Sequence, residues 1–187
     1  MKNEDILIPI GTPLGLWQDR GRIQNGSRLL ELDAASYVLW FYTHLTMDVG
    51  SWVSLSTEKG VAPDGQACLS HLRELEEMGL VARLEAGEAE RFLAAVQNLA
   101  AVRQGVYYRE SMEELTFAIG RDDLRIPNVP LVKLVWMGAD GHASLPELIR
   151  RNDREGICGD SKSLEQILII LLKNRLVLLE AKKDGAG

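Results

Sequence analysis

Two groups of polar side chains in this sequence have the chemistry and the spacing to contact nucleic acid. Amide and hydroxyl groups can hydrogen-bond to base edges, and arginine and lysine can pair with phosphates. The first group lies in a predicted helix that follows Pro63 and consists of Gln66, Ser70 and Arg73. The second group lies within residues 150–166 and consists of Lys162, Ser163, Gln166, Arg150, Arg151 and Arg154.

The charges around the two groups favour the second as a DNA contact. Glu74 and Glu77 lie on the next turn of the first predicted helix, where their carboxylates would repel phosphates. Residues 1–103 carry 9 Lys and Arg against 14 Asp and Glu, whereas residues 104–187 carry 12 against 13. The alternative, that the arginines of the second group only keep the surface soluble, stays open.

No set of residues has the sequence spacing of a catalytic or metal site. The chain contains no GxxxxGK[ST], GxGxxG, GxSxG or HExxH motif. His44, His71 and His142 are far apart, and Cys68 and Cys158 form no Cys-x-x-Cys pair. We therefore expect a protein that is not an enzyme and that uses no cofactor and no metal ion.

The helix that carries the first polar group has its own start and stop signals. Asp64 can cap its N-terminus, and apolar residues follow at helical spacing. Gly79 can supply a left-handed residue at its end. Residues 80–84, LVARL, are mostly apolar and predict a short strand.

Two further helices are predicted before it. Asp33 can cap a largely buried helix over residues 34–45, and Asp48 can cap a short second helix. A strand over residues 6–10 and a hairpin over residues 14–24 precede them. Three helices followed by a strand is the order of a winged helix-turn-helix unit.

The second half of the sequence repeats the first at an offset of 96 residues, with no gap. The aligned pairs are Trp40 and Trp136, Gly60 and Gly156, Asp64 and Asp160, Leu72 and Leu168, and Leu80 and Leu176. Asp48 falls on Ser144, so two residues that can both cap a helix share one position. Because caps, stops and core positions coincide, we expect two copies of one unit. The alternative is that two unrelated three-helix units share such residues at some offset.

The expected fold is mainly α with short β strands (α+β), in two tandem winged-helix-like units joined by an amphipathic linker helix. The expected boundaries are residues 1–87 for the first unit with its N-terminal strand and hairpin, 88–104 for the linker helix, and 105–187 for the second unit.

Apolar side chains on two predicted helices would need a partner. Those on one face of the linker helix are Phe92, Leu93, Val96 and Leu99. Residues 167–172, which include Ile169 and Ile170, are apolar all round, and such a helix is covered on both sides. The cover would be the other unit, a second copy of the chain or a different protein.

The segment LSHLRELEEMGLVARLE, residues 69–85, resembles the recognition helix and wing of bacterial winged-helix transcriptional regulators, in which an L-x-x-L-x-x-x-G-L-V/I run recurs. Residues 163–180, SLEQILIILLKNRLVLLE, resemble it less closely. The resemblance implies a DNA-binding regulator, although such segments also occur in winged helices that bind only proteins. The sequence departs from the family in passing from residues 85–88 straight into the predicted linker helix, without a long wing hairpin.

Two functional hypotheses follow. The first is a non-catalytic, dimeric, DNA-binding bacterial transcriptional regulator, and the second is a protein–protein interaction scaffold of the same fold that does not bind DNA. A formal net charge of −6 argues against DNA binding by bulk electrostatics and so favours the second hypothesis.

The expected location is the cytoplasm. The first five residues, MKNED, do not begin a secretory signal, and the longest aliphatic run, residues 167–172, is too short to cross a bilayer. The expected partners are therefore double-stranded DNA, a second copy of the chain or another protein, and not a membrane.

Overall fold

The computed structural model describes residues 2–46 and 48–182, and these form two compact units. Residues 2–46 and 48–88 belong to the first unit and residues 89–182 to the second. The last five residues of the predicted second unit, 183–187, lie outside the described residues. Each unit is taken by itself below.

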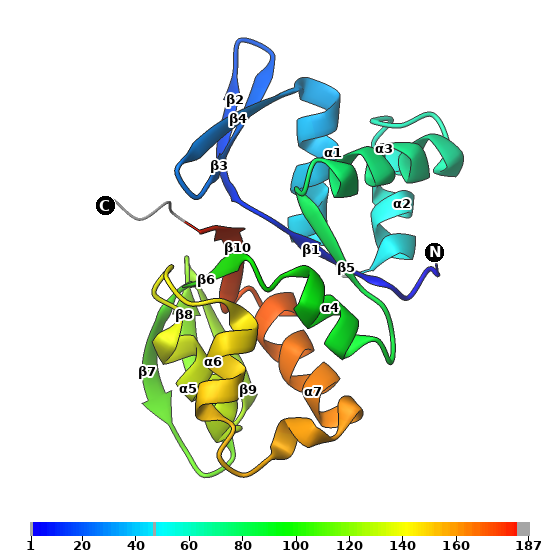
Figure 1. Ribbon diagram of the computed structural model, residues 1–187. Coiled ribbons are helices and arrows are strands. Elements are labelled where there is room, and N and C mark those ends of the chain that lie inside the picture. The colour runs from blue at the N-terminus through cyan, green and yellow to red at the C-terminus, as the bar shows by residue number, and fades with distance from the viewer. Residues whose placement is uncertain (1, 47, 183–187) are drawn as a thin grey trace. The chain divides into compact units, whose positions relative to one another are not determined.

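The first unit consists of a strand, a three-stranded sheet, three helices and a final strand (Figure 1). The elements are β1 (Ile6–Pro9), β2 (Thr12–Trp17), β3 (Arg20–Asn25), β4 (Arg28–Asp33), α1 (Ala34–Leu45), α2 (Val49–Glu58), α3 (Gly65–Glu77) and β5 (Val81–Leu84). Strands β2, β3 and β4 form an antiparallel sheet in that order, and β5 pairs antiparallel with β1.

The second unit has the same order of elements, preceded by one extra helix. The elements are α4 (Ala89–Ala95), β6 (Leu99–Arg103), β7 (Val106–Glu110), β8 (Glu114–Ile119), β9 (Asp122–Pro127), α5 (Pro130–Gly138), α6 (Leu145–Asn152), a 3-10 turn (Ile157–Gly159), α7 (Ser161–Leu168), a π-helical turn (Ile169–Lys173) and β10 (Val177–Ala181). Strands β7, β8 and β9 form an antiparallel sheet, and β10 pairs with β6.

The expectation of a mainly α fold is wrong. The described residues form seven α-helices and ten strands in four antiparallel sheets, with 41% of residues helical and 31% in strands. The fold is a mixed α+β fold. Two of its strands, β3 (RGRIQN) and β9 (DDLRIP), are hard to predict from the sequence because they carry few apolar residues. Backbone hydrogen bonds to neighbouring strands hold them in their sheets.

The predicted linker helix over residues 88–104 is also wrong. Helix α4 ends at Ala95, and Leu99–Arg103 is strand β6, which pairs along its whole length with β10. The apolar spacing of this segment fits a helix, but pairing with a strand far along the chain decides its conformation. Strand β5 pairs only with β1, and the next element after it is α4, so no wing hairpin follows it within residues 81–95.

The internal repeat is present in the structure, with a two-residue difference between its halves. The helices correspond at an offset of 96 residues, since α2 begins at Val49 and α6 at Leu145. The sheets correspond at an offset of 94, since β3 begins at Arg20 and β8 at Glu114. The gapless alignment is therefore wrong for the sheets, because Asn128 and Val129 lie between β9 and α5 whereas α1 follows β4 directly.

Equivalent hydrogen bonds join the first half of each unit to its last strand. The N–H of Ile10 donates to the carbonyl of Leu80 at 2.8 Å, and the N–H of Gln104 donates to that of Leu176 at 2.8 Å. These pairs match only if the offset is 94 before the helices and 96 after them. The two units are thus copies in backbone geometry as well as in element order.

Each unit has an aromatic core. In the first unit, the indole N–H groups of Trp40 and Trp52, both fully buried, donate to the carbonyls of Leu80 (3.0 Å) and Leu39 (2.9 Å). In the second unit the ring of Trp136 packs edge-on against Phe117, with ring centroids 5.1 Å apart. These contacts fix the helices against the strands in each unit.

Candidate functional site

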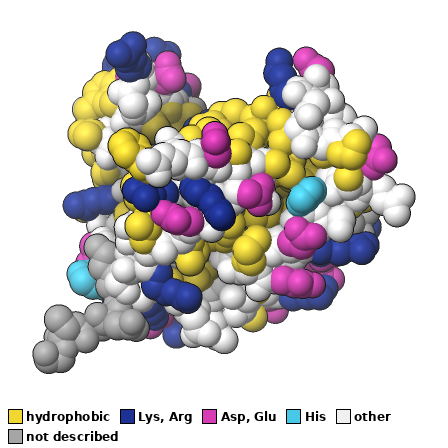
Figure 2. All heavy atoms as spheres, turned by 90° about the horizontal axis from the view of Figure 1, so that it is seen from above, with side chains coloured by type: hydrophobic (Ala, Val, Ile, Leu, Met, Phe, Trp, Pro, Cys, Tyr) yellow, Lys and Arg dark blue, Asp and Glu magenta, His cyan; other side chains and the backbone are white. Residues whose placement is uncertain are grey.

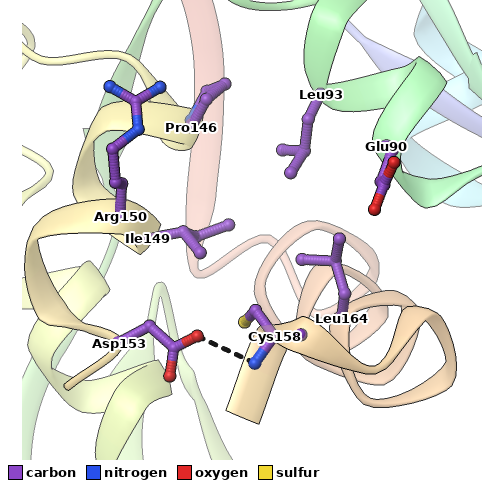
Figure 3. A pocket seen from close by; sticks show the side chains of 9 residues that line it. Glu90, Leu93, Pro146, Ile149, Arg150, Asp153, Cys158 and Leu164 are labelled. Atoms are coloured by element: carbon purple, nitrogen blue, oxygen red, sulfur yellow. Dashed lines mark hydrogen bonds between the residues drawn. The ribbon is translucent and has the colours of Figure 1, made fainter. Parts of the chain in front are cut away.

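A hollow lies inside the second unit, between α4, α6 and α7 (Figure 3). Its volume is about 520 Å³, within the size range of ligand sites. It is lined by Glu90, Leu93, Pro146, Ile149, Arg150, Asp153, Cys158, Gly159 and Leu164. We call it the α4 hollow.

Helix α4 forms one wall of the hollow because it packs on both α6 and α7. Phe92 on α4 and Val96, the residue that follows this helix, are only 2% and 1% exposed. Ile167 on α7 is 3% exposed, while its counterpart in the first unit at the 96-residue offset, His71, is half-exposed. The helix that is apolar all round is thus covered on one side by its own unit, a possibility that the sequence had not suggested.

The six apolar interface candidates therefore differ in how far they are buried. Phe92 and Val96 are buried within the folded chain, while the other four are half-buried. Those four are Leu93, Leu99, Ile169 and Ile170. Leu93 lines the α4 hollow, and Leu99 begins strand β6.

The thiol in the α4 hollow is poorly suited to nucleophilic chemistry. Burial raises the pKa of Cys158 to about 11, with Asp153 adding to the shift through its charge and a hydrogen bond from the thiol. The same carboxylate accepts the backbone N–H of Cys158 at 2.8 Å (Figure 3). Because the thiolate is the nucleophile, a thiol that stays protonated at neutral pH is unreactive.

The DNA-contact candidates on and after α6 lie among carboxylates. Arg150 lines the α4 hollow together with Glu90 and Asp153. Arg154 lines a separate hollow of about 130 Å³ beside α5, together with Asp153 and Glu155. Arg151, which lies between these two arginines in the sequence, is exposed. The three arginines therefore do not line one common hollow. Arg150 and Arg154 each line a hollow that also contains carboxylates.

The remaining candidates of the second unit lie on α7. Lys162 and Gln166 are exposed, so both can meet a partner. The Ser163 hydroxyl donates to Asp160 Oδ2 at 2.7 Å, and the Ser163 N–H donates to the same oxygen at 3.0 Å. Ser163 thus takes part in the cap of α7, which occupies its hydroxyl.

In the first unit, the candidates Gln66, Ser70 and Arg73 are all exposed on α3. Glu74 and Glu77 are exposed beside them, as the helical spacing predicted. Glu74 lies 3.3 Å from the imidazole of His71. Arg73 is the one cation among these three candidates, so this helix face has little attraction for phosphate.

Both three-stranded sheets expose large apolar side chains on their first strand, and sequence reasoning did not identify them as a site. On β2, Leu14, Leu16 and Trp17 are 55%, 54% and 60% exposed. On β7, Val106 and Tyr108 are 65% and 51% exposed. The signal was the apolar run LGLW in a predicted hairpin with no covering element.

Strands β2 and β7 occupy the same place in the two units. Each is an edge strand of its sheet, and each has a bulge, at Leu14 in β2 and at Tyr108 in β7. These two bulge residues correspond at the 94-residue offset of the sheets. Figure 2 shows hydrophobic side chains lying exposed among charged ones on one face of the molecule. We call the apolar residues of β2 and β7 the first-strand surfaces.

Two kinds of feature are absent from the described residues. No group of three or more His, Cys, Asp or Glu side chains in residues 2–46 and 48–182 is arranged to hold a metal ion. None of the helices in the described part of the chain is both long and apolar enough to cross a membrane.

Comparison with known proteins gave no match to a family model, to a curated protein or to a solved structure.

Proposed function

We propose that this protein is a non-catalytic scaffold that binds partner proteins through its two first-strand surfaces. The observation that carries the proposal is that the same edge strand, in both copies of the unit, exposes large apolar side chains. Edge strands with exposed apolar residues are sites where another chain adds or packs. Two copies of such a surface in one chain would allow two partner segments to be held at once.

The contact area favours association. Trp17 is 60% exposed, and burying that exposed part of an indole would contribute roughly 3 kcal/mol from removal of apolar surface from water. Leu14 and Leu16 lie on the same strand and add to this area. The bulge at Leu14 interrupts the β2 ladder, so we expect the partner to pack mainly on side chains.

DNA binding is the second candidate function, and it rests on the exposed Lys162 and Gln166 of α7. The net charge of −6 and the carboxylates beside Arg150 and Arg154 count against it. If DNA binds, its affinity would fall steeply with salt and would weaken in Lys162→Ala and Arg151→Ala. An electrophoretic titration at low salt checks this.

The proposal includes a cytoplasmic location. Cys68 and Cys158 are both free thiols, which suits a reducing compartment.

The test compares partner capture by the wild-type chain with capture by variants of the first-strand surfaces. Trp17→Arg and Val106→Lys place a charge on β2 and β7, and Met78→Lys is the matched control. Met78 is 49% exposed but lies at the end of α3. Purified full-length chains are incubated with a soluble extract of the host, and retained proteins are identified by mass spectrometry.

We expect wild type and Met78→Lys to retain the same protein in the same amount, and each strand variant to retain less of it because one of its two surfaces is changed. If all four chains retain the same proteins in the same amounts, or none retains any, the proposal fails. The mass of the purified chain in solution is measured in parallel, because self-association lost in Trp17→Arg would make the partner a second copy.

A further inference from the structure

Two arginines face each other across the outer surface of the second three-stranded sheet. Arg109 on β7 pairs with Thr116 on β8, and Thr116 pairs with Arg125 on β9, so the three residues form one row across the strands. Leu115 and Phe117, on either side of Thr116, are fully buried, so Thr116 points to the opposite, outer face. The row lines a hollow of about 100 Å³, together with Ser111 and Glu114.

The polar groups of this row have no partners among the described residues. Neither guanidinium group forms an ion pair or hydrogen bond within residues 2–46 and 48–182, and the Thr116 hydroxyl forms no hydrogen bond there. Thr116 is nonetheless only 6% exposed. Its hydroxyl lies at the hollow between two exposed arginines, so a group that enters the hollow can reach all three side chains, and the repulsion between two like charges in one row would be relieved by a bound anion.

In the first unit, the equivalent row of residues contains its own ion pair. At the 94-residue offset the row becomes Gly15, Arg22 and Glu31, and Arg22 Nε donates to Glu31 Oε1 at 2.9 Å. The second unit therefore has two arginines where the first has one arginine and its own carboxylate. The difference points to a ligand-supplied anion in the second unit.

Two carboxylates, Asp123 and Glu114, lie near the row, and neither forms an ion pair with Arg109 or Arg125 in the described structure. The hydrogen bond from Tyr108 to Asp123 raises the pKa of Tyr108, while the charges of Arg125 and Arg109 lower it, which places both cations near that hydroxyl. Glu114 lines the hollow but forms no ion pair with either arginine in the described structure. Ser111 Oγ accepts the N–H of Glu114 at 3.0 Å and is thus engaged in its own turn.

We propose that this hollow binds a phosphate group, held between Arg109 and Arg125 and hydrogen-bonded by the Thr116 hydroxyl. Guanidinium groups bind oxyanions through paired N–H donors. The donors approach from opposite sides, which suits a tetrahedral group whose oxygens point in several directions better than a planar carboxylate. The site lies on β7 and its neighbours but does not depend on the scaffold function being correct.

The experiment is an NMR titration of the ¹⁵N-labelled full-length chain with inorganic phosphate, using chloride at the same ionic strength as the reference. The expected result is a saturable shift of the Arg109 and Arg125 side-chain Nε–H signals and of the Thr116 amide. Arg109→Gln and Arg125→Gln should each weaken binding about tenfold, because each removes charge-assisted hydrogen bonds. Thr116→Val should weaken it less.

Arg121→Gln is the matched control, since Arg121 is exposed on the β8–β9 turn and does not line the hollow. It should keep wild-type affinity. A peptide carrying phosphoserine and the same peptide without phosphate are titrated as a second arm. Tighter binding of the phosphopeptide than of inorganic phosphate assigns the group to a partner protein, and equal binding assigns it to a free ion.

The proposal is overturned if phosphate and the phosphopeptide cause only the small, distributed shifts seen with chloride. It is equally overturned if Arg109→Gln and Arg125→Gln bind phosphate as well as Arg121→Gln does. Partner capture through the first-strand surfaces could persist in either case, so failure of this site and failure of the proposed scaffold function are distinguishable.

Discussion

At the scale of single residues, Glu147 shows how a short-range signal becomes a stabilising contact. It lies three residues after Ser144, at the start of α6, and accepts the Ser144 N–H at 2.7 Å and the Ser144 hydroxyl at 2.9 Å. These two bonds, followed by a contact with Lys182, lower the pKa of Glu147 to about 2 from a usual value of 4.5. The arrangement is a capping box that the sequence already suggested through Ser144.

The lowered pKa predicts how stability changes with pH. The stabilisation by Glu147 is fully present above pH 4.5 and is lost as the pH falls toward about 2, because the unfolded chain then binds the proton more readily. We expect Glu147→Gln to show a smaller loss of unfolding free energy than wild type over this range. Urea denaturation at a series of pH values measures it, and parallel losses in both chains would contradict it.

Cys158 gives a second prediction at this scale. A pKa of about 11 leaves on the order of a hundredfold less thiolate at pH 8 than an unshifted thiol would have. Alkylation by iodoacetamide should therefore be slow, and Asp153→Asn should speed it because the carboxylate no longer opposes ionisation. Peptide mass spectrometry over time follows the reaction at Cys158 and at the buried Cys68 separately. A wild-type rate equal to that of a small free thiol would refute the prediction.

At the scale of elements, the two copies of the unit end their third helix with the same left-handed backbone turn but with different residues. Gly79 ends α3 with a φ of +68°, and its counterpart in the second unit, Arg175, has a φ of +54°. The left-handed region suits glycine and strains a residue with a Cβ. The second copy thus keeps the backbone turn that the first copy specifies by sequence, and it does so with an unfavourable residue.

Replacing Arg175 by glycine should stabilise the second unit by about 1 kcal/mol. The reverse change, Gly79→Arg, is the matched control and should destabilise the first unit by a similar amount, because no atom lies within 4 Å of a Cβ built at Gly79 and only the backbone conformation is penalised. Chemical denaturation of both variants provides the comparison. A destabilised Arg175→Gly would show that the arginine side chain stabilises the turn.

At the scale of the whole molecule, each unit has its own core and its own paired first and last strands. Trp52 is fully buried in the first unit, and Leu148, its counterpart at the 96-residue offset, is 3% exposed in the second. Strands β6 and β10 pair within the second unit alone. This organisation indicates that each unit can lose its packing without the other.

Trp52→Ala should remove roughly 3–5 kcal/mol from the first unit while leaving the second folded. The measurement is amide hydrogen exchange, in which the β1–β5 pairing should lose protection and the β6–β10 pairing should keep it. Leu148→Ala should give the opposite pattern. Loss of protection in both pairings from either substitution would mean that the units unfold together.

The sequence by itself determined the features that depend on neighbours a few residues apart. Asp33, Asp48, Asp64 and Asp160 cap the helices they were predicted to cap, and α1 spans the predicted residues 34–45. A cap joins a side chain to an N–H two or three positions away, so residue type and spacing suffice to predict it. The repeat was visible for the same reason, since caps and stops recur with the helices.

Only the tertiary structure decided which segments pair and which side chains stay exposed. Leu99–Arg103 has helical spacing yet forms a strand, because β10 supplies its hydrogen-bond partners from far along the chain. Arg109 and Arg125 lie on either side of Thr116 only once three strands are in register, and Trp17 is exposed because none of the described elements covers it. Pairing and cover depend on distant residues, so the candidate surfaces could not be read from local pattern.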